Sequence, residues 1–485
     1  MADATEAIER GNEIFAIEVR GYDPIPEPER NMRLGQVGPL WAGTSVNMLS
    51  FALGALAFTL TQSLWLAIAA CVVGSLTYAG IAWGSVITAR VGLPVTTLAR
   101  AALGLRGNFP NTLLAWISSV AFEVINTVFG VYALLALFRV LGWTAAGATG
   151  KLLAVLLQLV LCGGIAVLGH ATMVWFQKLF AAGVGAVLLA VLVITLGQLH
   201  WGHPLQAHAP PPAGTVALFF SASAVVASNP MSYLFNGPDW VRYLPSTTPA
   251  RKIFRQVFWA SYPPSLALNV MGAWCATLGD MSDPVAGLQP FLPAWTFVLY
   301  IVAVVGGSLA NNVPTYYSSG LSLQALGLPV HRYLATLLDV IASTTIALYL
   351  LFIKDFSTAL NDFIALLIVW VGPFGGVWIA DARWRRARYD VRAIHAHSPA
   401  GRYWGWRGFN PAGCIALLAG MTVAALTMKS PLYQGPIAAA LGGADLSWLL
   451  GFPVAMVSYR LLAPRLERVP LAPVIPTLGT DRETA

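Results

Sequence analysis

A single carboxyl lies in the middle of a long apolar stretch of the sequence. Residues 117–130 read ISSVAFEVINTVFG, and Glu123 is the only charged residue among them. An ionisable group inside an apolar segment is costly and points to a function. An apolar environment favours the neutral carboxyl, so Glu123 can serve as a carrier of a coupling proton. The alternative is a structural role, in which a permanently protonated Glu123 donates a hydrogen bond.

Two neighbours of Glu123 extend the chemistry of this stretch. Phe122, Asn126 and Phe129 are four and three residues apart, so they share one face of a helix. That face offers a flat ring for stacking, and an amide that both donates and accepts hydrogen bonds. A planar heterocycle is the ligand that such a face suits. Glu123 can hydrogen-bond that ligand, carry a proton, or hold Asn126 in orientation.

A second polar cluster occurs in the stretch GGSLANNVPTYYSSGLSLQALG. Its polar side chains are Asn311, Asn312, Thr315, Tyr316, Ser318 and Ser319. Paired asparagines in an apolar segment need partners, which are other helices, a substrate or an ion. We expect Pro314 to break this helix, because proline lacks the N–H that a helix requires. A purely structural network is the alternative.

The composition identifies the class of protein that carries these residues. Of 485 residues, 57% are hydrophobic and 10% are charged, whereas a soluble domain carries about 25% charged residues. We therefore predict an all-α integral membrane protein with about twelve transmembrane helices of roughly 20 residues each. The predicted spans are 38–60, 63–88, 111–141, 150–169, 173–198, 215–244, 255–279, 292–322, 332–353, 357–380, 408–427 and 432–462.

The basic residues predict the orientation of the chain in the membrane. With the amino terminus in the cytoplasm, 24 of the 28 Lys and Arg residues lie on the cytoplasmic side, and only Arg139, Lys151, Lys354 and Lys429 lie outside. We predict a multi-pass protein of the plasma (inner) membrane with both termini cytoplasmic. The basic loop near residues 381–408 then faces anionic membrane lipid. The net charge is explained by topology, so we expect no nucleic-acid partner.

Metal and catalytic clusters are not evident in the sequence. Cys71, Cys162, Cys275 and Cys414 fall singly in apolar spans, where packing explains them. The histidines near residues 200–208 have no acidic neighbour and favour a flexible external loop over a metal site. We therefore predict neither a metal site nor a catalytic site, and no cofactor apart from a coupling cation. Asp339 is expected near a cytoplasmic helix end, where Arg332 can pair with it.

Two spans carry helix-breaking residues at mid-depth. The first contains Asn47 and Ser50 within WAGTSVNMLSFALGALAF, and the sixth contains Ser228, Asn229 and Pro230 in its middle. Interrupted helices in corresponding positions of two halves are typical of a transporter binding site. We predict a transport domain over residues 38–462. Its parts are a first repeat at 38–198, a second at 215–380 and accessory helices at 408–462, flanked by cytoplasmic tails at 1–37 and 463–485.

At these residues the chain resembles the nucleobase:cation symporter-1 family, and within it the purine/cytosine permease branch. The stretches that carry the resemblance are LWAGTSVNMLSFALGALAF, FEVINTVFG, PDWVRYLP and NNVPTYYSSGLSLQ. The resemblance implies a five-plus-five inverted-repeat core of the sodium–leucine transporter type, with alternating access. It also implies that a planar base is held between spans 1, 3, 6 and 8.

The resemblance assigns roles to particular residues. It places the stacking aromatic at Phe122, the following amide at Asn126, the unwound sixth-span segment at Ser228, Asn229 and Pro230, and the substrate asparagine at Asn312. Further substrate-binding candidates are Glu123, Thr315, Asn47 and Ser50, and the cation-site candidates are Gly307, Ala310 and Asn311. Sodium-coupled members of the family carry two hydroxyl residues where this chain has Ala310 and Asn311. We therefore favour proton coupling through Glu123 over sodium coupling.

The sequence thus predicts a secondary active transporter, not an enzyme, that imports cytosine or a purine by cation symport. We expect a monomer whose small-molecule partner is the nucleobase. The alternative is a sodium-coupled carrier of a related planar heterocycle: hydantoin, allantoin, uracil or a thiamine-like pyrimidine. A membrane enzyme would need a metal or nucleophile cluster, and a passive channel would need a continuous polar pore. A second stacking aromatic is expected near Pro230, where Tyr233 and Phe235 lie downstream.

Overall fold

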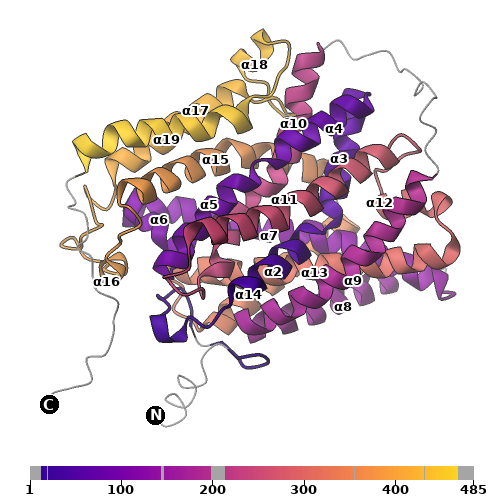
Figure 1. The fold of residues 1–485 in the computed structure, drawn as a ribbon, viewed down its shortest axis with the longest axis horizontal. Coiled ribbons are helices and arrows are strands. Elements are labelled where there is room, and N and C mark those ends of the chain that lie inside the picture. The colour runs from indigo at the N-terminus through magenta and orange to yellow at the C-terminus, as the bar shows by residue number, and fades with distance from the viewer. Residues whose placement is uncertain are drawn as a thin grey trace.

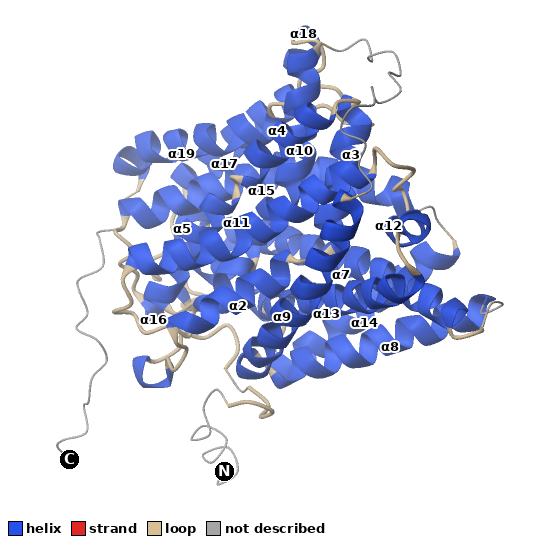
Figure 2. Ribbon diagram, turned by 45° about the vertical axis from the view of Figure 1, so that its right-hand side comes forward, coloured by secondary structure: helices blue, strands red, loops and turns tan. Residues whose placement is uncertain are grey.

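The computed structural model describes residues 13–18, 20–143, 147–197, 214–353, 356–430 and 432–467. This part of the chain is helical and contains no β-strand (Figure 2). The long helices are α2 (Leu34–Ser45), α3 (Met48–Thr61), α4 (Leu64–Ser75), α5 (Tyr78–Val91), α7 (Leu105–Val140), α8 (Gly147–Leu168), α9 (His170–Leu196), α10 (Thr215–Ser232), α11 (Ala250–Cys275), α13 (Ala294–Ala325), α14 (Arg332–Phe352), α15 (Phe356–Trp384), α17 (Pro411–Thr427) and α19 (Ser447–Leu466). The short elements are η1 (Glu27–Glu29), α6 (Val95–Leu103), η2 (Tyr233–Phe235), η3 (Gly237–Val241), α12 (Pro284–Leu288), η4 (Gln289–Phe291), α16 (Val391–Ile394) and α18 (Pro436–Ala440).

Eleven of the twelve predicted spans coincide with helical segments, and the twelfth, predicted at 432–462, starts too early because α19 begins at Ser447. The all-α membrane fold is confirmed. The first predicted span is the pair α2 and α3, the second is α4 with α5, and the sixth is α10 with η2 and η3. Eight segments of the described chain, or nine with the bent α2–α3 pair, are long and apolar enough to cross a membrane alone. The other three are α11, α17 and α19, which are shorter or more polar. Within the bundle, α11 packs on α2 and α3, and α17 and α19 pack on α15.

The first span is broken, as the sequence predicted, and the structure places the break at Asn47. The axes of α2 and α3 differ by 51° across the break. Asn47 Nδ2 donates to the Thr44 carbonyl at the end of α2 (2.9 Å), and Asn47 Oδ1 accepts from the Ser50 amide at the start of α3 (2.9 Å). Helix ends leave such groups without partners, and an apolar medium does not supply any. One asparagine therefore satisfies both helix ends at the break.

The sixth span is also broken, but at a different place from the one predicted. Helix α10 runs without interruption through Ser228, Asn229 and Pro230 and ends at Ser232. The chain then passes through η2 to Asn236, whose φ and ψ of −130° and −37° leave the helical region, and into η3. One proline removes a single N–H, which neighbouring helical bonds tolerate. The sequence Asn-Gly-Pro that follows is what stops the helix.

Helix α13 likewise continues through Pro314, so the predicted break in the eighth span is wrong. Pro314 cannot donate to the carbonyl of Ala310 one turn earlier. The Gln177 side chain on α9 replaces that donor, with Nε2 2.5 Å from the Ala310 oxygen. A partner from another helix thus keeps α13 whole at mid-depth.

The helices pack into a bundle in which α7 lies along α13 and α3 lies along α11 (Figure 1). Glycine permits the closest of these approaches. A Cβ built on Gly54 of α3 would fall 1.8 Å from the Asn269 carbonyl oxygen of α11, and one on Gly272 of α11 would fall 1.9 Å from the Phe51 carbonyl oxygen of α3. Small residues let membrane helices approach closely. Helices α17 and α19 pack on each other and on α15 at one edge of the bundle (Figure 1).

The two ends of the described chain lie on one face of the bundle. Tyr22 contacts the His395 ring (centroids 5.2 Å apart) and the Arg100 guanidinium (5.7 Å). Arg385, at the end of α15, donates to the Ala101 carbonyl beside Arg100 and forms an ion pair with Glu467. This shared face agrees with an even number of membrane crossings. Which side of the membrane it faces stays a prediction.

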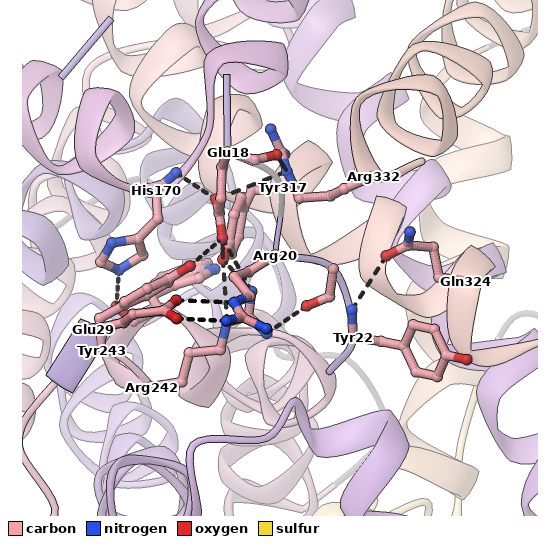
Figure 3. Close-up of polar contacts among 12 residues, drawn as sticks. Glu18, Arg20, Tyr22, Glu29, His170, Arg242, Tyr243, Tyr317, Gln324 and Arg332 are labelled. Atoms are coloured by element: carbon pink, nitrogen blue, oxygen red, sulfur yellow. Dashed lines mark hydrogen bonds and ion pairs between the residues drawn. The ribbon is translucent and has the colours of Figure 1, made fainter. Parts of the chain in front are cut away.

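Part of the predicted amino-terminal tail packs into that face, around Glu18 (Figure 3). The Glu18 carboxylate accepts from Tyr243 Oη (2.6 Å), Tyr317 Oη (3.0 Å) and Arg242 Nη2 (3.2 Å). Burial alone would raise the pKa of Glu18, but the Arg332 and Arg242 guanidiniums outweigh burial and hold its pKa below the ordinary value. Residues near Glu18 are therefore part of the folded core.

This arrangement corrects the pairing predicted for Arg332. Its guanidinium faces Glu18, with Arg332 Nε 3.8 Å from Glu18 Oε2, and donates to the Glu18 and Val167 carbonyls. Asp339, seven residues further along α14, is left without an arginine. The helix carries these two residues at different depths, so each finds its own partners.

Candidate functional site

The break in the first helix is where several predicted site residues meet. Asn126 on α7 donates from Nδ2 to Asn311 Oδ1 on α13 (2.9 Å). Asn311 in turn donates to the Tyr233 hydroxyl after α10 (2.5 Å) and to the Thr44 carbonyl at the end of α2 (3.1 Å). Asn126, Asn311 and Tyr233 are all buried. We call Asn126, Asn311, Tyr233 and Thr44 the amide network. It joins the first, third, sixth and eighth spans.

A hydroxyl-rich cluster lies on the other side of the same break. Ser50 Oγ on α3 accepts from Asn229 Nδ2 on α10 (3.0 Å) and lies 3.2 Å from Ser265 Oγ on α11. Asn47 caps α3 beside it. Asn229 and Ser50, both predicted site residues, thus contact each other, although α10 is not unwound there. Ser228 instead donates to the Val225 carbonyl of its own helix (2.6 Å).

The predicted stacking residue Phe122 lies one helical turn from Asn126. Its backbone carbonyl accepts from Asn126 Nδ2 (2.8 Å), and its ring meets the edge of the Phe363 ring of α15 at a centroid distance of 5.4 Å. Phe122 is buried in this arrangement. The Phe122 backbone is therefore bonded to the amide network, and its ring packs against an aromatic neighbour from a separate helix.

The two aromatics considered for the sixth span have different environments. Tyr233 reaches the amide network through its hydroxyl and packs edge-on against Trp41 and Trp240. Phe235 stacks on Phe374 of α15, with centroids 4.7 Å apart and planes 19° apart. Of the two, Tyr233 is the one that the structure brings to the helix break.

The adjacent asparagines of α13 point to different partners. Asn312 donates to the Glu123 carbonyl (3.1 Å) and to Thr127 Oγ1 (3.0 Å), both on α7, while its Oδ1 is buried without a described partner. The residue that faces Asn126 and Tyr233 is Asn311, which the resemblance placed in the cation site. Thr315 donates to the Asn311 carbonyl (2.9 Å) within α13 and supports it.

Glu123 and Asp339 meet in the interior. Both residues are completely buried, and their carboxyls interact across α7 and α14. Asp339 Oδ1 accepts from Trp116 Nε1 and from Ser319 Oγ, each at 2.7 Å. The sequence analysis singled out Ser319 but missed Trp116 and the Asp339 contact. Only tertiary packing places residues more than 200 positions apart side by side.

The cation-site candidates lie against the break of the first helix. Gly307 approaches Val46, and a Cβ on Gly307 would fall 3.1 Å from the Val46 carbonyl oxygen. Ala310 offers only its carbonyl, which already accepts from Gln177 Nε2. Gln177 also packs against Gly43 of α2. Gln177 is the one amide side chain in the largely apolar α9, and this is the signal that would have found it.

Two broken helices crossing a packed α7–α13 pair, with polar groups gathered at the break, are typical of a membrane transporter with a central binding site. The family model described as permease for cytosine/purines, uracil, thiamine, allantoin matches residues 24–451. The chain therefore belongs to this family of permeases, which are transporters and not enzymes. The match confirms the resemblance read from the sequence.

Individual relatives agree with this assignment. YxlA of Bacillus subtilis, itself named only provisionally as a purine-cytosine permease, is 25% identical over 93% of this chain and 97% of its own. The purine-cytosine permease FCY21 of Saccharomyces cerevisiae is 25% identical over 93% of this chain and 87% of its own. The allantoin permease of Bacillus subtilis is 22% identical over 90% and 91%.

A solved structure shows the same fold. Mhp1, a nucleobase-cation-symport-1 family transporter captured in a closed conformation with bromovinylhydantoin bound, superposes with a TM-score of 0.74. The alignment covers 93% of this chain and 97% of Mhp1 at 18% identity. A sodium-coupled sialic acid symporter superposes with a TM-score of 0.54. These likenesses confirm the predicted five-plus-five inverted-repeat architecture.

Proposed function

We propose that the protein imports a nucleobase, cytosine or a purine, across the plasma (inner) membrane by proton-coupled symport. The observation that carries this proposal is the amide network beside Phe122. Four interrupted or packed helices converge on it, and it combines a flat ring with amides that donate and accept. Membership in a family that includes cytosine and purine permeases supports the same substrate class.

The amide network suits recognition of a base by its edge. Asn126 and Asn311 are already hydrogen-bonded to each other and to Tyr233. A base that replaces some of these bonds gains specificity, because a ligand lacking the matching groups would leave buried amides unpaired. Stacking on Phe122 would add about 1–3 kcal/mol for any base, with little discrimination.

Proton coupling is favoured by the surroundings of the two cation candidates. The Ala310 carbonyl accepts an N–H from Gln177, and an N–H dipole turned toward this position repels a cation. Ala310 has no side-chain oxygen that could serve as a sodium ligand. Glu123, by contrast, is a completely buried carboxyl. Its one acidic neighbour among the described residues is Asp339, and its other neighbours are apolar or neutral. The loading of a proton on Glu123 therefore fits better than sodium binding near Ala310.

The test is uptake into proteoliposomes of radiolabelled cytosine and adenine. Imposed proton and sodium gradients are applied separately to the wild type and to Glu123→Gln. We expect proton-driven accumulation that the variant loses. Sodium-driven accumulation that Glu123→Gln retains would overturn the coupling, and would favour the sodium-coupled alternative. Allantoin, uracil, hydantoin and thiamine as competitors identify the substrate, and trans-stimulation by unlabelled substrate separates a carrier from a pore.

A further inference from the structure

The Glu123 carboxyl is buried beside a second acid, Asp339. Neither Glu123 Oε1 nor Oε2 has a hydrogen-bond donor in the described part of the chain, and neither does Asp339 Oδ2. The groups next to the Glu123 carboxyl are the Asp339 carboxyl and the Ser319 and Ser343 hydroxyls. Two carboxylates are both acceptors, so their oxygens can be joined only by a proton held between them.

The nearby donors are already committed elsewhere. Ser319 Oγ donates to Asp339 Oδ1 (2.7 Å), and Ser343 Oγ is 3.1 Å from the Tyr316 hydroxyl and 3.2 Å from the Val340 carbonyl. Asn312 Nδ2 donates to the Glu123 carbonyl and to Thr127 Oγ1. A proton on the acid pair is thus the hydrogen-bond donor that this part of the core lacks.

The charges around the pair lead to the same result. The titratable groups facing it are Tyr316 on α13 and Cys162 on α8, together with the two acids on α7 and α14. Neither acid forms an ion pair in the described chain, and Arg332 of α14 is directed to Glu18. Two buried negative charges side by side would carry a desolvation penalty and a mutual repulsion that no described cation offsets.

We infer that Glu123 and Asp339 together form the proton-binding site of the transporter, sharing one proton in a carboxylic acid–carboxylate pair. This inference rests on the proposed proton coupling and adds its second residue. Binding is H⁺ plus two carboxylates giving one hydrogen-bonded pair of charge −1; release reverses it. The proton holds α14 against α7, and its loss sets like charges against each other across that contact.

The acid pair lies close enough to the substrate site for its protonation to affect that site. The Glu123 backbone carbonyl accepts from Asn312, which is adjacent to Asn311 of the amide network, and Glu123 lies within one helical turn of Asn126. A shift of α7 relative to α14 therefore moves Asn126, which we propose contacts the base. Asp339 does not touch the base itself, so we assign it to proton binding and not to substrate binding.

The test compares Asp339→Asn with Asp280→Asn, the same chemical change at an exposed loop carboxyl. Asparagine keeps an Oδ1 acceptor for Trp116 and Ser319, so folding should be preserved, and Asp339→Glu provides a variant that retains the acid. We expect Asp339→Asn to lose at least tenfold of proton-driven cytosine accumulation while cytosine counterflow stays within about twofold of wild type. Asp280→Asn should match the wild type in both assays. Proton-driven accumulation at the wild-type level in Asp339→Asn would overturn the inference.

A spectroscopic arm does not depend on transport. The infrared C=O stretch of a protonated carboxyl should appear in the purified wild type and in Asp280→Asn, and disappear in Glu123→Gln/Asp339→Asn. An unchanged band in the double variant would place the protonated acid elsewhere and overturn the pair. If the band behaves as expected but no nucleobase is carried under any gradient, the proposed substrate is wrong and the shared proton stands.

Discussion

Asn311 and Asn312 provide a matched comparison within one helical turn. Replacing either by alanine removes the same amide. In Asn311→Ala, Asn126 Nδ2 still donates to the Phe122 carbonyl, and the Thr44 carbonyl still accepts from Asn47. The Tyr233 hydroxyl, however, loses the one hydrogen-bond partner found for it in the described chain. Leaving a buried polar group unsatisfied costs about 1–3 kcal/mol. Because we propose that the base hydrogen-bonds to Asn311, the variant also removes a partner of the bound base at the same cost, and we expect nucleobase binding to weaken by about 5- to 150-fold.

Asn312→Ala serves as the control, because its partners are on α7 outside the amide network. Asn312 donates to the Glu123 carbonyl and to Thr127, both on the continuous helix α7. Loss of these two hydrogen bonds should change substrate affinity by less than about threefold. The assay is equilibrium binding of radiolabelled cytosine to purified protein, with size-exclusion profiles to verify folding. If Asn312→Ala loses binding while Asn311→Ala keeps it, the assignment implied by the family resemblance is right and the one made from the hydrogen bonds is refuted.

Three further predictions concern the ring, the amino-terminal segment and helix packing. Phe122→Ala should weaken cytosine binding by about 1–3 kcal/mol, the scale of one stacking contact, and Phe122→Trp should not; equal affinities for wild type and Phe122→Ala would mean that the ring only packs. Glu18→Gln should lower the free energy of unfolding by about 3–5 kcal/mol, since Arg242 and Arg332 lose their buried counter-charge. Because the pKa of Glu18 is held below its ordinary value of about 4.3, this stabilisation is complete above that value and is lost as pH falls below it; thermal melts of both proteins from pH 7 to pH 3 should converge, and parallel curves would contradict the network. Gly54→Ala should prevent folding, because its Cβ would overlap the Asn269 carbonyl; a normal yield of monodisperse protein would show that α3 and α11 can separate.

Several parts of the site were predictable because their signals are local. The polar residues around Asn47 predicted a break in the first helix, since helix-breaking and capping residues can be recognised in a short stretch of sequence. Phe122, Glu123 and Asn126 share a helix face by spacing alone. The breaks predicted at Pro230 and Pro314 were wrong because a missing N–H can be compensated from outside the helix, as Gln177 does for Ala310.

The sequence by itself determined the class of this protein: its low charge, its apolar spans and its family motifs follow from composition and local pattern. Only the tertiary structure decided which polar groups share a partner. Arg332 turns to Glu18 and not to Asp339, Asp339 meets Glu123, and Asn311 rather than Asn312 faces Asn126. Hydropathy and helical spacing set which face a residue occupies along its own helix. The depth and rotation of one helix against another depend on packing contacts between distant segments, and those decide where each buried charge finds its counterpart.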